Sequence, residues 1–495
     1  MRKIIFLENK NSYIKTFVLI AILVLLTVFL IGYLSIDQPP IVYISIISAI
    51  VIITITALFL RNINIAVPVL IIVLPISKIV FSLQIFPFVG YLIKITPIDI
   101  FTVTAVICLF LYKIAAKGRK NILLKEKSGP GYLSLLLFVL VAFGISSVMW
   151  SPNIILGLNF CIKLILNCLM YLLLVVLIKN ERDILRAIKT LIFITVIIAA
   201  TMIVSIFPID LLNIKKTYFL TEYLALQVVF KTYQLKASSI TYPQDSATIL
   251  TFGVLFSMGL LSQNKGKKEK IMLSLIIIFL ILSALYTKAR GPIASMLVAI
   301  LFLIFAIKNF RTNFFRNLYL FTICFIFLFG IFITTHSYLI DVIKPYLPPS
   351  SSVGEHSFSD RLKYWETVYN ALKNSGAYIQ GLGAGGANYY LLEVPHTHNI
   401  YLSIFFDLGL TGLVIFFTLI SISITKLFLT IRSLKEGFAK AMLLSASGSI
   451  LAIGLTALLD YNYNFWLLWF IIGLSTAIYR YAASIPEESL SNSIS

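Results

Sequence analysis

The sequence predicts an all-α fold: a polytopic membrane bundle of about 12–14 transmembrane helices, with an outer cap that contains an amphipathic helix. Hydrophobic residues make up 59% of the chain and charged residues 12%, and the mean hydropathy is +0.98. A soluble domain of this length could not bury that much apolar surface. Apolar stretches of about 20 residues, enough for a helix to cross a bilayer, recur along the chain.

Fourteen stretches fit such a span. In the third, Pro68 and Pro75 interrupt the pattern, so a re-entrant segment is the alternative there. The expected spans are 14–34, 41–60, 63–80, 97–115, 132–149, 158–178, 188–207, 245–262, 271–288, 291–308, 317–335, 398–425, 441–459 and 463–480.

Lysine and arginine predict the orientation. They are concentrated in alternate connections, most strongly at 113–129 and 263–270, which the positive-inside rule places in the cytoplasm together with both termini. The first apolar segment is too long for a cleavable signal and reads as a signal anchor. The net charge of +20 follows from this topology, because the remaining segments are almost neutral. Nucleic acid is therefore not expected as a partner.

Two long outer loops divide the chain, while the other connections are short. The expected regions are N-terminal transmembrane helices (1–207), an outer loop (208–244), central transmembrane helices (245–335), a large outer loop (336–397), C-terminal transmembrane helices (398–480) and a cytoplasmic tail (481–495).

The large outer loop contains a predicted amphipathic helix, which lies on the membrane surface or caps a cavity. Ser359 fits its N-cap and Gly376 ends the pattern. Leu362, Trp365, Val368, Tyr369 and Leu372 recur between them at helical spacing. The glycine-rich run 380–390 follows, and either brings backbone N–H groups close to a ligand or forms a flexible return.

His398 is the leading candidate for proton transfer, because it lies where the chain enters an apolar span from the outer side. Imidazole normally has a pKa of about 6.5 and accepts a proton near neutral pH. Gly409 follows eleven residues later on nearly the same helical face, and Gly409 and Gly412 would let a neighbouring helix approach closely. The alternative is an interfacial histidine that only hydrogen-bonds a loop.

Four cations are candidates for binding an anion. Arg290 lies at the outer turn between two spans, where its guanidinium could grip phosphate oxygens or anchor the helix at the interface. Lys288 is two residues away and fits a snorkelling anchor better. Lys236 closes the first outer loop. Lys163 lies within an apolar run, and either faces a partner or snorkels to the outer interface.

The cysteines do not indicate metal or redox chemistry. All four lie in apolar spans without metal-ligand spacing beside histidine, and no glycine motif for nucleotide binding is present. No cofactor is expected.

Taken together, these motifs resemble the O-antigen ligase/polymerase superfamily. The matching residues are Ser359-Asp360-Arg361 with Trp365, Gly381-x-Gly383-x-Gly385, His398-Asn399 with Gly409 and Gly412, and Arg290-Gly291. The resemblance covers about residues 230–480. One departure concerns the segment before residue 245, where family members often carry arginine, glycine and then Pro-Asn. This chain has Lys236 and Pro243-Gln244, so the positive charge is kept without the bidentate fork.

The resemblance implies a metal-independent glycosyltransferase that uses undecaprenyl-diphosphate-linked glycan at the outer face of the bacterial cytoplasmic membrane. It implies catalytic roles for His398 and Arg290, and substrate-binding roles for Lys236, Arg361, Asn399 and Lys288. The expected partners are the lipid-linked glycan donor, a glycan acceptor, membrane lipid and other polysaccharide-export proteins.

The span count and the large loop favour one activity within this family: polymerisation of lipid-linked repeat units for an O-antigen, capsule, teichuronic acid or exopolysaccharide. The alternative is ligase-type transfer of finished glycan to another acceptor. A transporter of lipid-linked sugars is a further alternative, but it would need ionisable residues paired along a path through many spans.

Overall fold

The computed structural model describes twelve segments of the chain, and the statements below concern these alone. They are residues 58–59, 62–73, 81–83, 93–95, 97–117, 132–204, 243–263, 266–287, 289–307, 358–391, 397–458 and 465–485. The expected spans 14–34 and 317–335, most of 41–60, and the candidate residues Lys236 and Lys288 lie outside the described residues.

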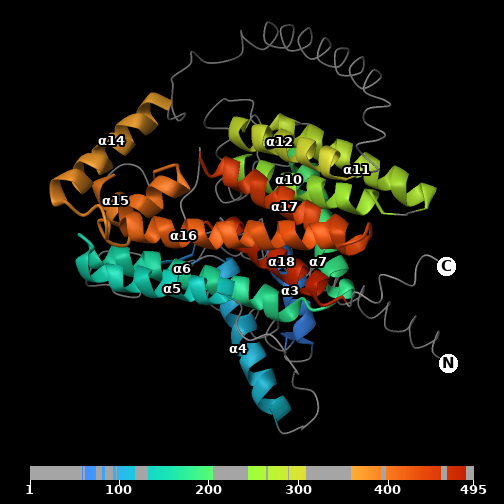
Figure 1. Cartoon of the computed structure of the whole chain (residues 1–495), viewed down its shortest axis with the longest axis horizontal. Coiled ribbons are helices and arrows are strands. Elements are labelled where there is room, and N and C mark those ends of the chain that lie inside the picture. Colours follow the sequence, from blue (N-terminus) through green and yellow to red (C-terminus); the bar gives the residue numbers. More distant parts are fainter. Residues whose placement is uncertain are drawn as a thin grey trace, which may run out of the picture.

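The described part is almost entirely helical, which confirms the predicted all-α membrane fold (Figure 1). The α-helices are α3 (Ala66–Val73), α4 (Pro97–Lys117), α5 (Tyr132–Ser146), α6 (Ile154–Leu177), α7 (Glu181–Val204), α10 (Pro243–Leu261), α11 (Lys267–Tyr286), α12 (Arg290–Ala306), α14 (Phe358–Ser375), α15 (Gly386–Tyr390), α16 (Ile400–Ser433), α17 (Phe438–Thr456) and α18 (Trp466–Ala483). Two 3-10 turns, η1 (Ile63–Ile65) and η3 (Ser147–Trp150), and one antiparallel pair of three-residue strands, β1 (Phe81–Leu83) and β2 (Ile93–Ile95), complete it.

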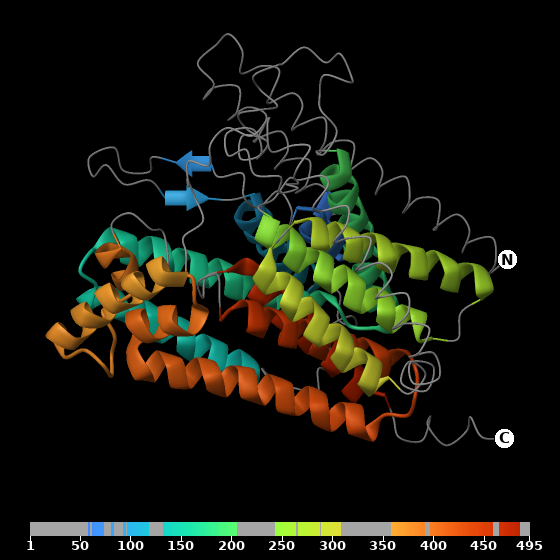
Figure 2. The ribbon, with the colours of Figure 1, turned by 90° about the horizontal axis from the view of Figure 1, so that it is seen from above.

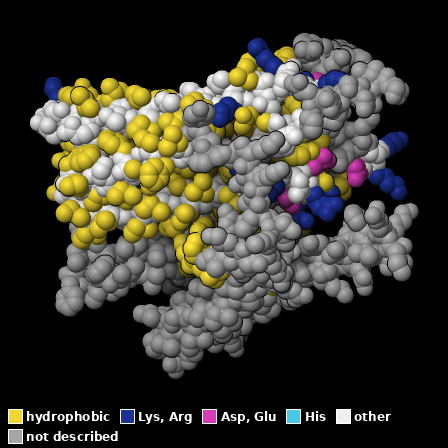
Figure 3. Space-filling view, turned by 60° about the horizontal axis from the view of Figure 1, so that its bottom comes forward, with side chains coloured by type: hydrophobic (Ala, Val, Ile, Leu, Met, Phe, Trp, Pro, Cys, Tyr) yellow, Lys and Arg dark blue, Asp and Glu magenta, His cyan; other side chains and the backbone are white. Residues whose placement is uncertain are grey.

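Eight of these helices are long and apolar enough to cross a membrane. Shorter apolar helices, including the 17-residue α12, lie beside them. Side chains such as Phe110, Phe138 and Leu282 remain more than 60% exposed, which suits contact with lipid. Figure 3 shows apolar side chains over much of the described face, with charged side chains gathered mainly toward one end. The chain is a multi-pass membrane protein.

Helix α10 is the centre of one half of the bundle. It packs against α7, α11, α12 and α17, and 89% of its membrane-crossing window is buried. Small residues bring the helices close together: a Cβ on Gly253 would overlap the side chain of Thr195 in α7. Ser445 of α17 donates a hydrogen bond to the Leu255 carbonyl at 2.9 Å. Close packing and interhelical hydrogen bonds are the means by which helices associate in lipid.

The contacts of α10 also fix helix directions. Leu255 lies beside Ser445, while Gly259 lies beside Ala441, so α10 and α17 are antiparallel. Short connections make α10, α11 and α12 alternate in direction, and α12 packs along α17. The N-terminal ends of α10 and α12 therefore lie at the same end of the bundle as the C-terminal end of α17.

Helices α5, α6, α16 and α18 form the neighbouring group, seen from two directions in Figures 1 and 2. Gly473 of α18 lies against the backbone of Tyr171 in α6, and α5 packs along α16. Helices α14 and α15 cover the ends of α5, α6 and α16 (Figures 1 and 2).

The two ends of the bundle differ in composition. We call the end where α10, α12 and α16 begin the site end, and the end where α7, α11 and α17 begin the basic end. The described lysines and arginines near the basic end are Lys179, Arg182, Arg186, Lys189, Lys267, Lys268, Lys270, Arg432, Lys435, Lys440 and Arg480. Tyr481 Oη donates to Glu181 at this end and ties α18 to α7.

Candidate functional site

His398 adopts a strained backbone conformation immediately before α16. Its φ of 54° is the one positive value among the described non-glycine residues. Its side chain is half-buried. The left-handed region is disfavoured for residues with a Cβ, and such outliers gather at functional sites where neighbouring contacts hold them. The residues on either side of His398 show how the conformation is maintained.

On the side before His398, Thr397 is fully buried and hydrogen-bonded to the cap helix α14. The indole Nε1 of Trp365 donates to the Thr397 carbonyl at 2.7 Å. The Thr397 hydroxyl donates to the Asn399 carbonyl at 3.0 Å, which closes a tight turn around His398. Trp365, which the sequence analysis placed on the apolar face of the amphipathic helix, is thus a hydrogen-bonding anchor as well.

On the side after His398, Asn399 fixes the start of α16. Its Oδ1 accepts from the Leu402 amide at 3.0 Å, which is an N-cap. Its Nδ2 donates to the Leu458 carbonyl at 2.9 Å, and the Ile400 amide donates to Ala457 at 3.0 Å. Both ends of the Asn399 amide therefore hold backbone groups. This geometry gives Asn399 a positioning role, and direct binding of substrate remains a prediction.

The expected span 398–425 corresponds to α16, but this helix breaks at Gly409. This glycine has φ 64° and ψ −166°, which is not helical and is essentially restricted to glycine. A Cβ there would overlap the Ile379 carbonyl oxygen and the Gly381 amide. His398 and Gly409 therefore do not share one face of a regular helix. The close approach that Gly409 permits is to the loop before α15, not to a helix, whereas a Cβ on Gly412 would meet the Leu408 side chain of α16 itself.

We call residues 376–387 the glycine segment. It supplies the hydrogen bonds that the broken helix lacks. The Leu382 and Gly383 amides donate to the Phe406 and Asp407 carbonyls at 2.8 and 2.9 Å. Across the break, the Leu410 and Thr411 amides donate to the Tyr378 and Ile379 carbonyls at 2.9 and 3.1 Å. Irregular backbone at membrane depth is tolerated where protein satisfies its polar groups in this way.

The other face of the glycine segment docks on the N-terminal helices. The Ala384 amide donates to Ser147 Oγ at 3.1 Å, and Ser151 Oγ donates to the Ala384 carbonyl at 2.9 Å. Gly383 and Gly157 make close backbone contacts at the same place. The described geometry is that of a packed connector and not of a flexible return, and the approach of its N–H groups to a ligand stays a prediction.

Helix α14 confirms the predicted amphipathic helix and caps the site end. Val368 and Leu372 are fully buried against Leu382 and Phe406 in a small separate core. Leu362 and Tyr369, predicted on the same face, are instead 47% and 45% exposed. Among the described residues, the buried face of α14 is therefore narrower than the sequence pattern suggested.

Arg290 is the first residue of α12, and its side chain is exposed. Ala289 precedes it and provides no side-chain cap. A cation in the first turn adds to the positive end of the helix dipole, so this helix start favours an anion. From the helix directions above, the starts of α12 and α16 lie at the same end of the bundle. Arg361 lies half-buried in α14, one turn before Trp365.

Two buried carboxylates, those of Asp99 and Asp407, lie near this end. Lys163 forms an ion pair with Asp99 of α4, so it faces a partner instead of snorkelling. Asp407, 1% exposed, lies just before the break in α16, and its Oδ1 accepts from the Ala387 amide at 2.7 Å. The sequence analysis missed Asp407. A single carboxylate inside an apolar span was the signal that could have identified it.

Within the described residues, no group of three or more histidines, cysteines, aspartates or glutamates is placed to hold a metal ion. The described polar groups at the site end are instead an imidazole, guanidinium groups and carboxylate or hydroxyl side chains used in helix packing. This set can exchange a proton and attract an anion.

Comparison with known proteins finds a similarity to one family over part of the chain. No curated protein matches the chain significantly. A chain from one solved structure is 13% identical to this chain. That structure is described as "Structural coordination of polymerization and crosslinking by a peptidoglycan synthase complex". The superposition covers 71% of this chain and 98% of that chain with a TM-score of 0.40, which is too low to support an inference.

Residues 275–417 match the Wzy_C family, described as O-antigen ligase. The matched segment begins within α11 and ends within α16, and it includes Arg290, Trp365, His398 and Gly409. Together with the membrane-spanning helices, the match supports a membrane enzyme that processes glycans. This match over residues 275–417 agrees with the family resemblance of the sequence motifs.

Proposed function

We propose that the protein is a glycosyltransferase that polymerises polyprenyl-diphosphate-linked repeat units at the outer face of the bacterial cytoplasmic membrane. The observation that carries the proposal is the left-handed His398, held between the Trp365–Thr397 and Asn399–Leu458 hydrogen bonds. Such a conformation costs on the order of 1–3 kcal/mol of free energy. A half-buried imidazole that is held in place despite this cost is a good candidate for a reacting group.

In the proposed reaction, His398 takes the proton from an acceptor sugar hydroxyl. The hydroxyl oxygen then bonds to the anomeric carbon of the donor sugar, and the bond from that carbon to the diphosphate oxygen breaks. The polyprenyl diphosphate leaves with the bonding electron pair. General-base catalysis of this kind typically contributes a factor of about 10²–10⁴ in rate.

Arg290 is proposed to stabilise the leaving diphosphate. Its permanent charge and the start of α12 both attract negative charge, and its fork suits phosphate oxygens. Lys236 and Lys288 are proposed to assist as additional cations, and Arg361 to position the glycan from the cap. The donor lipid tail would lie along the exposed apolar helices, which explains why the enzyme is embedded in the membrane.

Ligase-type transfer is the second candidate, favoured by the description of the matched family. The two activities differ in the acceptor: another lipid-linked repeat unit for a polymerase, and a different acceptor molecule for a ligase. The fixed His398 suits both, because both deprotonate a hydroxyl.

Deleting the gene and sizing the surface glycan separates the candidates. A polymerase predicts a product of one repeat unit, whereas a ligase predicts full-length glycan that is not attached to its acceptor. Surface glycan of normal length and attachment would contradict both activities. Complementation with Arg290→Lys, which keeps the charge without the fork, should restore less product than the wild type, and the exposed-residue variant Lys373→Gln should restore all of it.

A further inference from the structure

We infer that Asp407 is a positioning residue, which holds the glycine segment in the break of α16 and thereby fixes the end of α16 next to His398. Asp407 is nine residues after His398 in the sequence. Its carboxylate lies between the cap and the start of α16, and the proposed reaction needs both. The role in catalysis rests on the proposed function, while the mechanical role does not.

The Asp407 carboxylate is buried and hydrogen-bonded. Asp407 is 1% exposed, and burying a charge in a membrane protein is costly unless it is hydrogen-bonded. Its Oδ1 accepts from the Ala387 amide at 2.7 Å, a short charge-assisted bond. The carbonyl of the same residue accepts from the Gly383 amide at 2.9 Å. Asp407 therefore holds the glycine segment at two points.

The segment of α16 between His398 and the break, residues 400–408, is a short piece of helix that is held at both ends by hydrogen bonds. We call it the strut. At one end, Asn399, Ile400 and Tyr401 bond to the last carbonyls of α17 and its continuation. At the other end, Phe406 and Asp407 accept hydrogen bonds from the glycine segment.

The break in α16 makes the strut depend on the glycine segment. Because Gly409 interrupts the helix, the spanning part of α16 after residue 409 cannot hold the strut by helical hydrogen bonds through that point. The glycine segment takes over this task, and it is itself docked on Ser147 and Ser151. If the Asp407 contact is lost, both ends of the strut should loosen, including the amides next to His398.

Hydrogen exchange on the full-length protein in lipid nanodiscs tests the inference without any substrate. The variants are Asp407→Leu, which removes the acceptor at similar size, and Asp407→Asn, which keeps an acceptor oxygen without the charge. Glu366→Gln, an exposed carboxylate on α14, is the control. In Asp407→Leu we expect amide exchange to accelerate by roughly tenfold or more in residues 382–391 and also at Ile400 and Leu402. Asp407→Asn should show a smaller change.

Unchanged exchange in Asp407→Leu would overturn the inference. Faster exchange in residues 382–391 with no change at Ile400 and Leu402 would also overturn it, because the contact would then be local. If Asp407→Leu fails to fold, Asp407→Asn provides the same comparison. In transfer assays, a positioning role predicts that kcat falls more than KM rises, with partial rescue in Asp407→Asn. A wild-type protein without transfer activity would refute the proposed function, while the exchange result would still decide the role of Asp407.

Discussion

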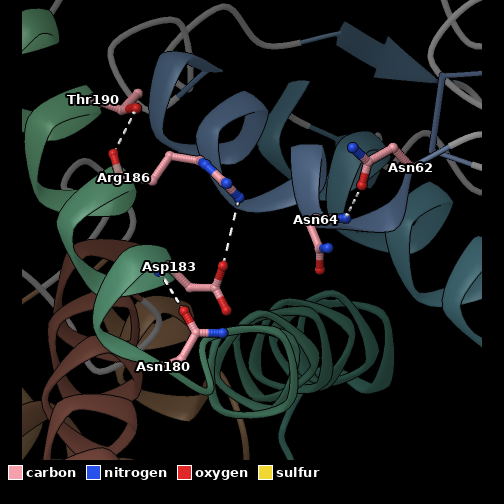
Figure 4. A network of polar contacts seen from close by, with 6 residues as sticks. All are labelled: Asn62, Asn64, Asn180, Asp183, Arg186 and Thr190. Atoms are coloured by element: carbon pink, nitrogen blue, oxygen red, sulfur yellow. Dashed lines mark hydrogen bonds and ion pairs between the residues drawn. The ribbon is translucent and has the colours of Figure 1, made fainter. Parts of the chain in front are cut away.

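The site end and the basic end of the bundle use polar groups in opposite ways. At the basic end, α7 begins with a local cap and a local ion pair: Asn180 accepts from the Asp183 amide at 3.0 Å, and Arg186 pairs with Asp183 at 3.5 Å (Figure 4). At the site end, a helix is broken, a histidine is left-handed, and hydrogen bonds join residues that are far apart in sequence. Local caps need no tertiary support, whereas the irregular end depends on several segments at once. Irregularity of this kind is expected where a protein maintains a functional geometry.

The largest effect should come from Gly409→Ala. The substitution adds a Cβ that overlaps the Ile379 carbonyl, at a backbone conformation reserved for glycine. We expect a loss of more than about 4 kcal/mol of stability, seen as failure to accumulate or as a large fall in thermal unfolding temperature in detergent. Gly437→Ala, at the basic end, has open space around the new Cβ and is the matched control. Equal stability of the two variants would remove the distinction between the ends.

The next effect concerns the buried ion pair. Lys163→Met leaves the Asp99 carboxylate buried without its cation, which costs about 3–5 kcal/mol for a buried pair. The double variant Asp99→Asn/Lys163→Met should recover most of the loss. At the basic end, Lys440→Met breaks a pair at 3.1 Å with the exposed carboxylate of Glu436 and should cost about 0.5 kcal/mol or less. Thermal unfolding of the four proteins measures the difference, and a Lys163 effect as small as that of Lys440 would refute the pairing.

A smaller effect is expected for Trp365→Phe. The substitution keeps an aromatic ring, although a smaller one, and the Thr397 carbonyl loses its donor, at a cost of about 1–3 kcal/mol. Because this bond supports the turn at His398, glycan transfer should fall more than the change in stability explains. Trp150→Phe, at a partly exposed ring, is the control for removal of an indole. Full transfer activity in Trp365→Phe would show that the turn does not need this anchor.

The smallest effect is predicted for Asp183→Asn at the basic end. The ion pair to Arg186 is partly exposed and local, so its loss should change stability by about 0.5 kcal/mol or less, and raised salt should reduce even that difference. Unfolding temperature at low and high salt checks this. A loss above about 2 kcal/mol would mean that the basic end is as dependent on its polar contacts as the site end.

Hydropathy predicted the eight described helices that are long and apolar enough to cross a membrane, because such a segment must satisfy its backbone internally and expose apolar side chains. The amphipathic α14 also followed from local spacing. The break at Gly409 did not, because its hydrogen bonds come from Tyr378 to Gly383, about thirty residues earlier, and a sequence period shows only local contacts.

The candidate site was predictable in residue type and only partly in geometry. His398 and Arg290 stood out as a rare imidazole and an interfacial guanidinium, each beside a glycine pattern. The partner of Lys163 and the role of Asp407 depend on packing between distant helices, which no local pattern encodes. The matched family segment begins at residue 275, so Asp99 and Lys163 lie outside it as well.

The most direct measurement is glycan transfer by the purified protein with a polyprenyl-diphosphate-linked repeat unit, comparing the wild type with His398→Asn. Asparagine tolerates the left-handed conformation and preserves the turn, but it cannot act as a base near neutral pH. The account predicts lengthened product from the wild type and a rate about 10²–10⁴-fold lower from the variant. A His398→Asn protein that forms product at the wild-type rate would contradict it.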